Sequence, residues 1–489
     1  MSRSLKSKTI HGVFWSLLER GGQQGIGLVI SIILARLLLP EQFGLIAMLT
    51  IFIAIPRSFI DSGFGQALIQ KKDATHVDEC SIFYFNILVG FLAAGLLCLA
   101  APWIADFYNQ PLLTPLTRVL SLKLIISSFG LVQTSLLTKH IDFKTQLKVS
   151  IIAVIASGII GITMAYRGFG VWSLVAQSLS SSLFTTALLW LSQRWRPVCA
   201  FSFASLRTMF SFGSKLLLSG LLDTIFQNIY LIVIGKVFAA KDLGFYSRAK
   251  SCTRLSTENL TGSINRVAFP VFSTIQDDNS RLKRGVRRAL TTMIFLNFPM
   301  MIGLLVIAKP LVLVLLKEKW LPCVSYLQLL CVMGLLHPLH VINLNLLKAK
   351  GRSDLFFRLE VLKKILVVIS ITLTYRWGIQ AMIYGQIGVS LLTYYLNSYY
   401  SGKLIGYPLK EQVFDLLPYL GMAVVMGIGV YAIRWFRFPN NCALLISQVL
   451  VGMFIYAVIS WVFRIPAFVE VIDILRGKIK LSKLWLRKN

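Results

Sequence analysis

Charged residues, and acidic residues above all, are scarce in this sequence. Only 14% of its 489 residues are charged, and 50 Lys and Arg stand against 20 Asp and Glu. Soluble domains carry about a quarter charged residues, so a chain with 56% apolar residues is not a soluble globular protein. The shortage of acids also disfavours a transporter that takes up cationic drugs at acidic sites.

The cysteine patterns that bind metals or form redox centres are missing too. The seven cysteines are scattered, odd in number and without CxxC spacing. This distribution favours a role as small apolar packing residues. The sequence therefore predicts no cofactor and no metal site.

A cleavable signal peptide is not expected. The first apolar segment follows a basic start but is interrupted by Glu19, Arg20, Gln23 and Gln24, and no small-x-small site follows it. We therefore predict that this segment is retained as the first membrane span.

Apolar stretches of about 20 residues recur along the whole chain, each long enough to cross ~30 Å of hydrocarbon at ~1.5 Å per residue. They predict an all-α membrane protein with about fourteen transmembrane helices. The eighth span is interrupted by charged residues, and it is included because the charge bias and the repeat described below require it. The predicted spans are 10–35, 43–65, 81–101, 115–138, 149–166, 171–192, 208–234, 243–272, 289–316, 321–347, 359–375, 379–400, 413–433 and 441–463.

The basic residues outside the spans are unevenly distributed. With an even number of spans both termini lie on one side, which holds 29 of these Lys and Arg against nine on the other. The positive-inside rule therefore places both termini in the cytoplasm. Because topology accounts for most of the surplus charge, no support remains for nucleic-acid binding. The outer loops are also too short for a catalytic domain, so the chain is predicted not to be an enzyme.

Similar residue groups recur in the same order about 200 positions apart, which predicts two parallel six-span copies with a site between them. The predicted domains are a lobe at 1–200, a lobe at 201–405, additional helices at 406–463 and a basic cytoplasmic tail at 464–489. The tail is expected either to lie on the anionic inner leaflet or to be solvated. The matching groups are Ala35-Arg36-Leu37 and Phe43-Gly44 with Gly235-Lys236-Val237 and Leu243-Gly244, Arg57-x3-Asp61-x3-Gly65 with Arg254-x3-Glu258-x3-Gly262, Pro102 with Pro310, and Gly170 with Gly378.

Twelve Lys and Arg lie within the spans, whereas only five acids lie at comparable depth. Each charge at a helix centre costs ~2.5–3.5 kcal/mol to insert, so this excess is expected to line a water-filled cavity. Spans 1, 2, 7 and 8 carry most of it, with polar residues at steps of three or four on one helix face. The residues predicted to bind phosphate are Arg20, Arg57, Lys215, Arg248, Lys250 and Arg254; those predicted to couple ions or tune charge are Glu19, Asp61, Asp223 and Glu258; and those predicted as polar cavity residues are Gln24, Gln227 and Asn265.

Two interpretations of the Arg57–Asp61 and Arg254–Glu258 pairs are open. At a spacing of i,i+4 the two partners can neutralise each other's charge and hold the helices in place. Alternatively, the planar guanidinium groups bind phosphate oxygens bidentately, and the acids adjust the strength of that binding or release the phosphate. His337 and His340 are predicted to pack or to form hydrogen bonds between helices, because no carboxylate or cysteine accompanies them.

Four stretches resemble the polysaccharide transporter family of the multidrug/oligosaccharidyl-lipid/polysaccharide (MOP) superfamily, and more narrowly the Wzx-type flippases of lipopolysaccharide, O-antigen or colanic acid units. The resemblance covers essentially the whole chain. It implies a MATE-like fold of two six-helix lobes in a V, to which the fourteen-span lipid II flippases add two helices. The stretches are GVFWSLLERGGQQGIGLVISIILARLLLPEQFGLIAM, DSGFGQALIQKKD, LLTKHIDFK and LLKAKGRSDLFFRLEVLKK.

The resemblance also implies a substrate and a location. The substrate is an undecaprenyl-diphosphate-linked oligosaccharide, moved across the bacterial inner membrane by alternating access, with membrane lipids and the polysaccharide polymerase and chain-length machinery as further partners. Protons, sodium ions or the membrane potential are open as the energy source. The rival functions are a cation-coupled drug exporter of the same superfamily and a lipid-linked-sugar polymerase or ligase.

Overall fold

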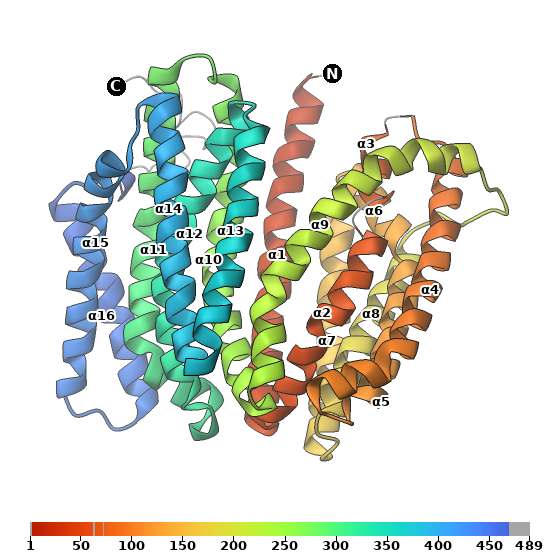
Figure 1. Cartoon of the computed structure of the whole chain (residues 1–489), viewed down its shortest axis with the longest axis horizontal. Coiled ribbons are helices and arrows are strands. Elements are labelled where there is room, and N and C mark those ends of the chain that lie inside the picture. The colour runs from red at the N-terminus through yellow and green to blue at the C-terminus, as the bar shows by residue number, and fades with distance from the viewer. Residues whose placement is uncertain (1, 62–63, 72, 469–489) are drawn as a thin grey trace. The chain divides into compact units, whose positions relative to one another are not determined.

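The protein is built from α-helices, as a computed structural model of the chain shows (Figure 1). The structure describes residues 2–61, 64–71 and 73–468. Within these ranges it contains no β-strand, and three short 3-10 helices, at Glu318–Trp320, Tyr375–Trp377 and Ile433–Trp435, join longer ones. The α-helices are α1 (Ser2–Leu37), α2 (Pro40–Asp61), α3 (Phe64–Gln70), α4 (His76–Tyr108), α5 (Leu113–Ser128), α6 (Leu131–Lys139), α7 (Phe143–Tyr166), α8 (Trp172–Ser192), α9 (Phe203–Val237), α10 (Ala240–Thr274), α11 (Asn279–Leu316), α12 (Cys323–Ala349), α13 (Ser353–Thr374), α14 (Ile379–Ile405), α15 (Leu409–Ala432) and α16 (Asn441–Val462).

Each of the fourteen predicted spans falls on a helix or on a pair of consecutive helices. Among the described residues, nine helices are long and apolar enough to cross a membrane, and the pair α5 and α6, bent by 42°, gives a tenth. The chain is therefore a multi-span membrane protein. The count of fourteen stays a prediction, because the remaining helices α1, α10, α13 and α14 are shorter in their apolar part or less apolar.

Polar groups in the loops determine where several helices begin and end. Thr75 starts α4 with a capping box, and the side chain of Asp278 accepts a hydrogen bond from the backbone N–H of Arg281 at the start of α11. Gly406, at φ 66°, ends α14 in the left-handed conformation that glycine adopts without strain. These groups satisfy backbone donors and acceptors that the helix itself leaves unpaired.

The helices form two compact units, Met1–Gly244 and Phe245–Asn489. In the first unit α7 packs against both α1 and α8, α4 packs against α5, and α9 packs against α2, α3 and α4. The prediction placed α9 in the second lobe, whereas its contacts within the described chain group it with the first. The six-helix lobes and their boundaries at 200 and 405 stay a prediction.

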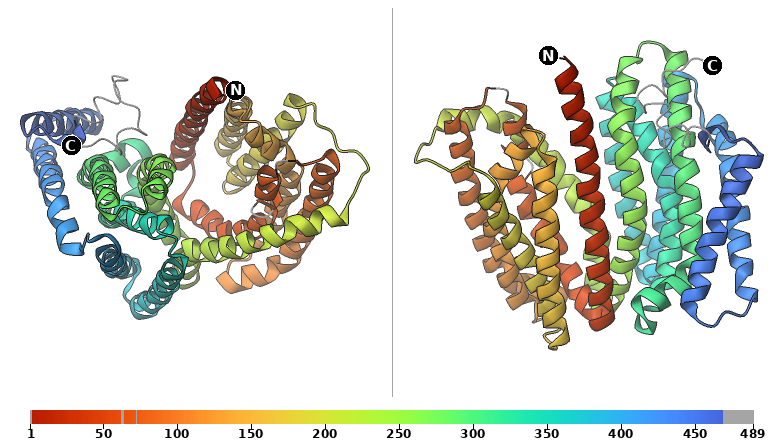
Figure 2. Two further views of the ribbon diagram at one scale, coloured as in Figure 1. Left: turned by 90° about the horizontal axis from the view of Figure 1, so that it is seen from above. Right: turned by 180° about the vertical axis from the view of Figure 1, so that it is seen from behind.

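In the second unit α11 packs against α12, α15 and α16, and α14 packs against α12 and α13 (Figure 2). A buried polar cluster joins three of these helices. Ser401 of α14 donates a hydrogen bond of 2.6 Å to Asn343 of α12, and the Asn343 amide donates one of 3.2 Å to Gln412 of α15. Because hydrogen bonds between helices hold in an apolar medium, the predicted additional helices are fixed to this unit.

Two ion pairs support the same attachment at one end of α15. Lys283 of α11 lies 2.7 Å from Glu411, and Arg287 pairs with Asp415 one turn further along. The beginning of the predicted tail also folds back: Phe468 packs with its ring centroid 6.3 Å from that of Phe295. Ala467 is buried and Ile465 and Phe468 are half-buried, whereas Pro466 is exposed; residues 469–489 lie outside the described residues, and the two expected positions of the tail stay predictions.

The helix boundaries follow the predicted repeat. α1 ends at Leu37 and α9 at Val237, and the next helices begin at residues 40 and 240. At both corners a glycine allows close approach: a Cβ on Gly44 would lie 1.7 Å from the carbonyl oxygen of Ala240, and one on Gly244 would lie 2.0 Å from that of Pro40. The first turns of α2 and α10 therefore cross in close contact, and each helix contributes one glycine to the crossing.

Candidate functional site

The structure describes the side chains of eight of the thirteen predicted site residues. The side chains of Arg57, Asp223, Gln227 and Arg254 are exposed, those of Glu19, Gln24 and Lys250 are half-buried, and that of Arg248 is buried. The side chains of the other five, Arg20, Asp61, Lys215, Glu258 and Asn265, lie outside the described part of the structure.

In the first unit, two predicted site residues lie next to the contact where α2 crosses α9. The hydroxyls of Ser58 and Thr224 lie 3.1 Å apart and fix the crossing. Their chain neighbours Arg57 and Asp223 flank this contact, and both side chains are exposed. Arg57, which is predicted to bind phosphate, and Asp223, which is predicted to tune charge, are therefore each one residue away from this helix contact.

The helix α1, which carries the predicted residues Glu19 and Gln24, packs against another helix. α1 packs along α7, with Gly22 facing Ile151. The Gln24 side-chain oxygen is buried and accepts no hydrogen bond within the described residues. Its role as a polar cavity residue stays a prediction.

The three cations of α10 in the second unit differ in access. Arg254 is exposed and Lys250 half-buried, but Arg248 is only 8% exposed. The Arg248 guanidinium carbon lies 5.5 Å from the centroid of the Trp320 ring, within the range of a cation–π contact. The Trp320 ring and surrounding protein cover Arg248. Arg254 and Lys250 are therefore the more accessible of the three residues on this helix that are predicted to bind phosphate.

His340 in α12 behaves as predicted. Its Nε2 lies 2.9 Å from the Ser390 hydroxyl, and its Nδ1 lies 3.2 Å from the Asn397 amide nitrogen. Both partners belong to α14, so this histidine joins two helices by hydrogen bonds.

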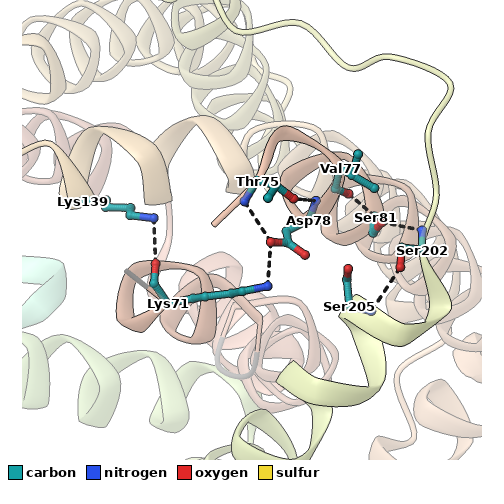
Figure 3. Close-up of polar contacts among 8 residues, drawn as sticks. All are labelled: Lys71, Thr75, Val77, Asp78, Ser81, Lys139, Ser202 and Ser205. Carbon is teal, nitrogen blue, oxygen red and sulfur yellow. Dashed lines mark hydrogen bonds and ion pairs between the residues drawn. The ribbon is translucent and has the colours of Figure 1, made fainter. Parts of the chain in front are cut away.

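A second polar cluster, which the sequence did not reveal, surrounds the start of α4 (Figure 3). The buried Asp78 carboxylate accepts hydrogen bonds from the Lys71 ammonium at 2.6 Å and from the Thr75 backbone N–H at 2.9 Å. Beside it, the Ser81 hydroxyl accepts a bond of 2.8 Å from the backbone N–H of Ser202, which caps α9.

This cluster ties several chain segments together. Lys139, at the end of α6, donates a hydrogen bond of 2.8 Å to the Lys71 carbonyl oxygen. The ends of α3, α4, α6 and α9 are thus joined in the first unit (Figure 3). Since its polar groups bond to one another, we assign the cluster a structural role in holding the start of α9.

Asp78→Ala is expected to lower the stability of the protein by about 1–2 kcal/mol, because it removes the capping box and the Lys71 ion pair. The melting temperature of the purified protein in detergent measures this loss. Asp73→Ala is the matched control: Asp73 is exposed in the same turn, and its removal should leave the melting temperature unchanged. Equal melting temperatures for both variants would contradict the structural role.

Two of the four stretches that carry the family resemblance form tight turns between helices. In LLTKHIDFK, Ile141 has φ 61° and the Asp142 side chain caps α7 by accepting the Thr145 N–H at 3.1 Å. In the turn between α12 and α13, Arg352 binds both oxygens of Asp354, at 2.9 and 2.8 Å. These hydrogen bonds hold the pKa of Asp354 at about 2, so the pair stays charged at every physiological pH.

Comparison with solved structures identifies the fold. Lipid II flippase MurJ, in an inward closed conformation, aligns with a TM-score of 0.75 over 92% of this chain and 98% of that protein, at 13% identity. An inward-facing multidrug resistance MATE family transporter of the MOP superfamily aligns with a TM-score of 0.61 over 78% of this chain and 95% of that protein, at 14% identity. The chain therefore has the MurJ- and MATE-like transporter fold, as predicted.

The sequence comparisons identify the family. Residues 33–325 match the family model described as "Polysaccharide biosynthesis protein". The lipopolysaccharide biosynthesis protein WzxC of Escherichia coli strain K12 is 30% identical over 79% of this chain and 78% of its own length. The succinoglycan biosynthesis transport protein ExoT of Rhizobium meliloti strain 1021 is 26% identical over 98% of both chains. The chain belongs to this polysaccharide biosynthesis family, which confirms the resemblance found in the sequence.

Proposed function

We propose that this protein flips undecaprenyl-diphosphate-linked oligosaccharide units from the cytoplasmic to the periplasmic face of the bacterial inner membrane by alternating access. Its family membership and its fold support a transporter rather than an enzyme. The observation that carries the proposal is the excess of cations within the predicted spans, with Arg57 and Arg254 exposing their side chains at corresponding places in the two copies.

The chemistry of the substrate suits these residues. A diphosphate presents several negatively charged oxygens, and a guanidinium group binds such oxygens through paired, charge-assisted hydrogen bonds. Apart from the covered Arg248, the remaining predicted phosphate ligands are Arg20, Lys215 and Lys250, which add positive charge on spans 1, 7 and 8. We propose that Glu19, Asp61, Asp223 and Glu258 tune this charge so that the diphosphate is released as well as bound.

The proposed orientation follows from the charge bias, with both termini in the cytoplasm. The substrate is then collected where cytoplasmic enzymes assemble it and delivered to the polymerase and chain-length machinery outside. O-antigen and colanic acid units are the classes of glycan that the family suggests. The driving force is the uptake of protons or sodium ions or the membrane potential, which supplies ~2.3 kcal/mol per charge per 100 mV.

Deletion of the gene tests the proposal. The deletion strain is expected to lose surface polysaccharide and to accumulate one lipid-linked oligosaccharide on the cytoplasmic face, and the purified protein is expected to flip that lipid in liposomes. Imposed pH, sodium or potential gradients then identify the energy source.

Unchanged surface polysaccharide with altered drug resistance would favour a drug exporter instead. Polymer formation by the purified protein would identify a polymerase.

A further inference from the structure

Two turns between helices, one in each unit, have the same backbone geometry. The first joins α6 to α7 and the second joins α12 to α13, and each contains one residue in the left-handed region, Ile141 at φ 61° and Gly351 at φ 68°. The same three backbone hydrogen bonds close both turns, so the turns correspond to each other. These N–H to carbonyl bonds are His140–Leu136, Ile141–Thr138 and Asp142–Leu137 in the first, and Lys350–Leu346, Gly351–Lys348 and Arg352–Leu347 in the second.

A lysine of each turn reaches the loop that follows a helix with an exposed predicted phosphate ligand. The Lys139 ammonium donates a hydrogen bond of 2.8 Å to the carbonyl oxygen of Lys71, in the loop after α2 and the short α3 (Figure 3). The Lys350 ammonium donates a hydrogen bond to the carbonyl oxygen of Gln276, in the loop after α10. Lys139 is the last residue of α6, whereas Lys350 directly follows α12. The two lysines therefore reach equivalent loops from neighbouring positions of the same turn.

Both contacts extend to the helix that follows the loop. Lys71, whose carbonyl oxygen accepts the bond from Lys139, pairs at 2.6 Å with Asp78 in the first turn of α4. Lys350 itself donates a second hydrogen bond, of 2.6 Å, to the side-chain oxygen of Asn279 at the start of α11. In each unit a lysine thus joins the loop after the arginine-bearing helix, the start of the next long helix and the end of a third. We call this arrangement a lysine tie.

Apolar side chains from the same three segments pack together in each unit. The buried members include Leu68 of α3, Ile82 of α4 and Leu136 of α6 in the first unit, and Phe272 of α10, Val286 of α11 and Leu346 of α12 in the second. Burial of such side chains supplies most of the stability of a contact between helices. The fold is therefore expected to survive the loss of one lysine, whereas the exact position of the loop depends on the directional hydrogen bonds.

We propose that Lys139 and Lys350 are positioning residues for the diphosphate site, because they fix the ends of the segments that carry Arg57 and Arg254. The inference rests on the proposed function. Each arginine-bearing helix is then held on both sides of its arginine, since the first turns of α2 and α10 already meet at the two-glycine crossing. A guanidinium group forms paired bonds to phosphate oxygens only in a narrow geometry, and a displacement of about 1 Å can cost about 100-fold.

Binding of undecaprenyl diphosphate to the purified full-length protein in detergent tests this role at the second tie. Lys350→Met removes the ammonium group and is expected to raise the Kd about five- to tenfold, with a melting temperature close to that of the wild type. Lys350→Arg keeps a donor and should restore most of the affinity. In an Arg254→Ala background Lys350→Met should have little further effect, because the lysine acts through that arginine.

The control for this tie is Lys348→Met. Lys348 is exposed in the last turn of α12, where its ammonium lies 4.5 Å from the centroid of the Phe356 ring, so its removal should leave the Kd unchanged. The same comparison at the first tie uses Lys139→Met with and without Arg57→Ala. Lys148→Met, at an exposed position of α7, is its control.

An unchanged Kd for both tie variants would overturn the proposal, and a lowered melting temperature alone would show a purely structural role. Equal fold-increases with and without the arginine would also overturn it. Flipping of the lipid-linked oligosaccharide in liposomes separates these results from a failure of the proposed function. If the wild type flips the lipid but the tie variants bind normally, only the positioning role is wrong. If the binding pattern is as expected but the wild type does not flip the lipid, the lysines position a diphosphate site that serves another purpose.

Discussion

Gly44→Ala is expected to abolish transport and to destabilise the protein strongly. The added methyl group would lie 1.7 Å from the carbonyl oxygen of Ala240. No rotamer change relieves this distance, because the Cβ is held rigidly by its own Cα and the oxygen belongs to the backbone. The first turns of α2 and α10 must then move apart. Overpacking of this kind costs about 1–3 kcal/mol or more, and here it displaces two helices that carry predicted site residues. Gly244→Ala, which would meet the Pro40 carbonyl oxygen at 2.0 Å, is expected to have the same effect.

The melting temperature in detergent and the recovery of surface polysaccharide in the deletion strain measure the two parts of this prediction. Gly95→Ala is the matched control, because a Cβ on Gly95 of α4 meets nothing within 4 Å. Alanine is the better helix former by about 1 kcal/mol, so this control should be as stable as the wild type or slightly more stable. Normal polysaccharide in the Gly44→Ala strain would show that the close crossing is dispensable.

Helix positions were predictable because the bilayer demands an apolar run of fixed length for every crossing. All fourteen predicted spans coincide with helices, including the charged span on α10. Apolarity carries less information about where a helix ends, since α4 and α11 continue well beyond their predicted spans into polar sequence. The break between α5 and α6 falls at Phe129 and Gly130; the glycine was visible in the sequence, but glycine also occurs in unbroken membrane helices.

The candidate site was predictable only as a set of residue types on particular helices. Charge counting identified Arg57 and Arg254, whose side chains are exposed, but could not distinguish them from Arg248. Arg248 is covered by Trp320, which lies 72 residues further along the chain. The spacing of polar residues within α10 gives no indication of such a contact.

Replacement of Arg57 or Arg254 by alanine is expected to lower the flipping rate in liposomes about 10- to 150-fold, the equivalent of ~1.5–3 kcal/mol for one charge-assisted hydrogen-bonded contact with phosphate. Arg→Lys at either position should recover part of the rate, because the charge remains but the bidentate geometry is lost. Arg167→Ala is the matched control: Arg167 is exposed at the end of α7, outside the predicted spans. This variant should flip at the wild-type rate.

Double variants decide between the two interpretations of the i,i+4 pairs. If Arg57 and Asp61 only neutralise each other, removing both should restore much of the activity that Arg57→Ala loses, because no uncompensated charge is left in the membrane. If Arg57 binds the diphosphate, the double variant should remain as slow as Arg57→Ala, because the phosphate ligand is missing whichever acid is present. The same comparison of single and double variants at Arg254 and Glu258 tests the second copy. If both double variants recover flipping, the arginines serve helix packing, and the diphosphate is bound by Arg20, Lys215 and Lys250 instead.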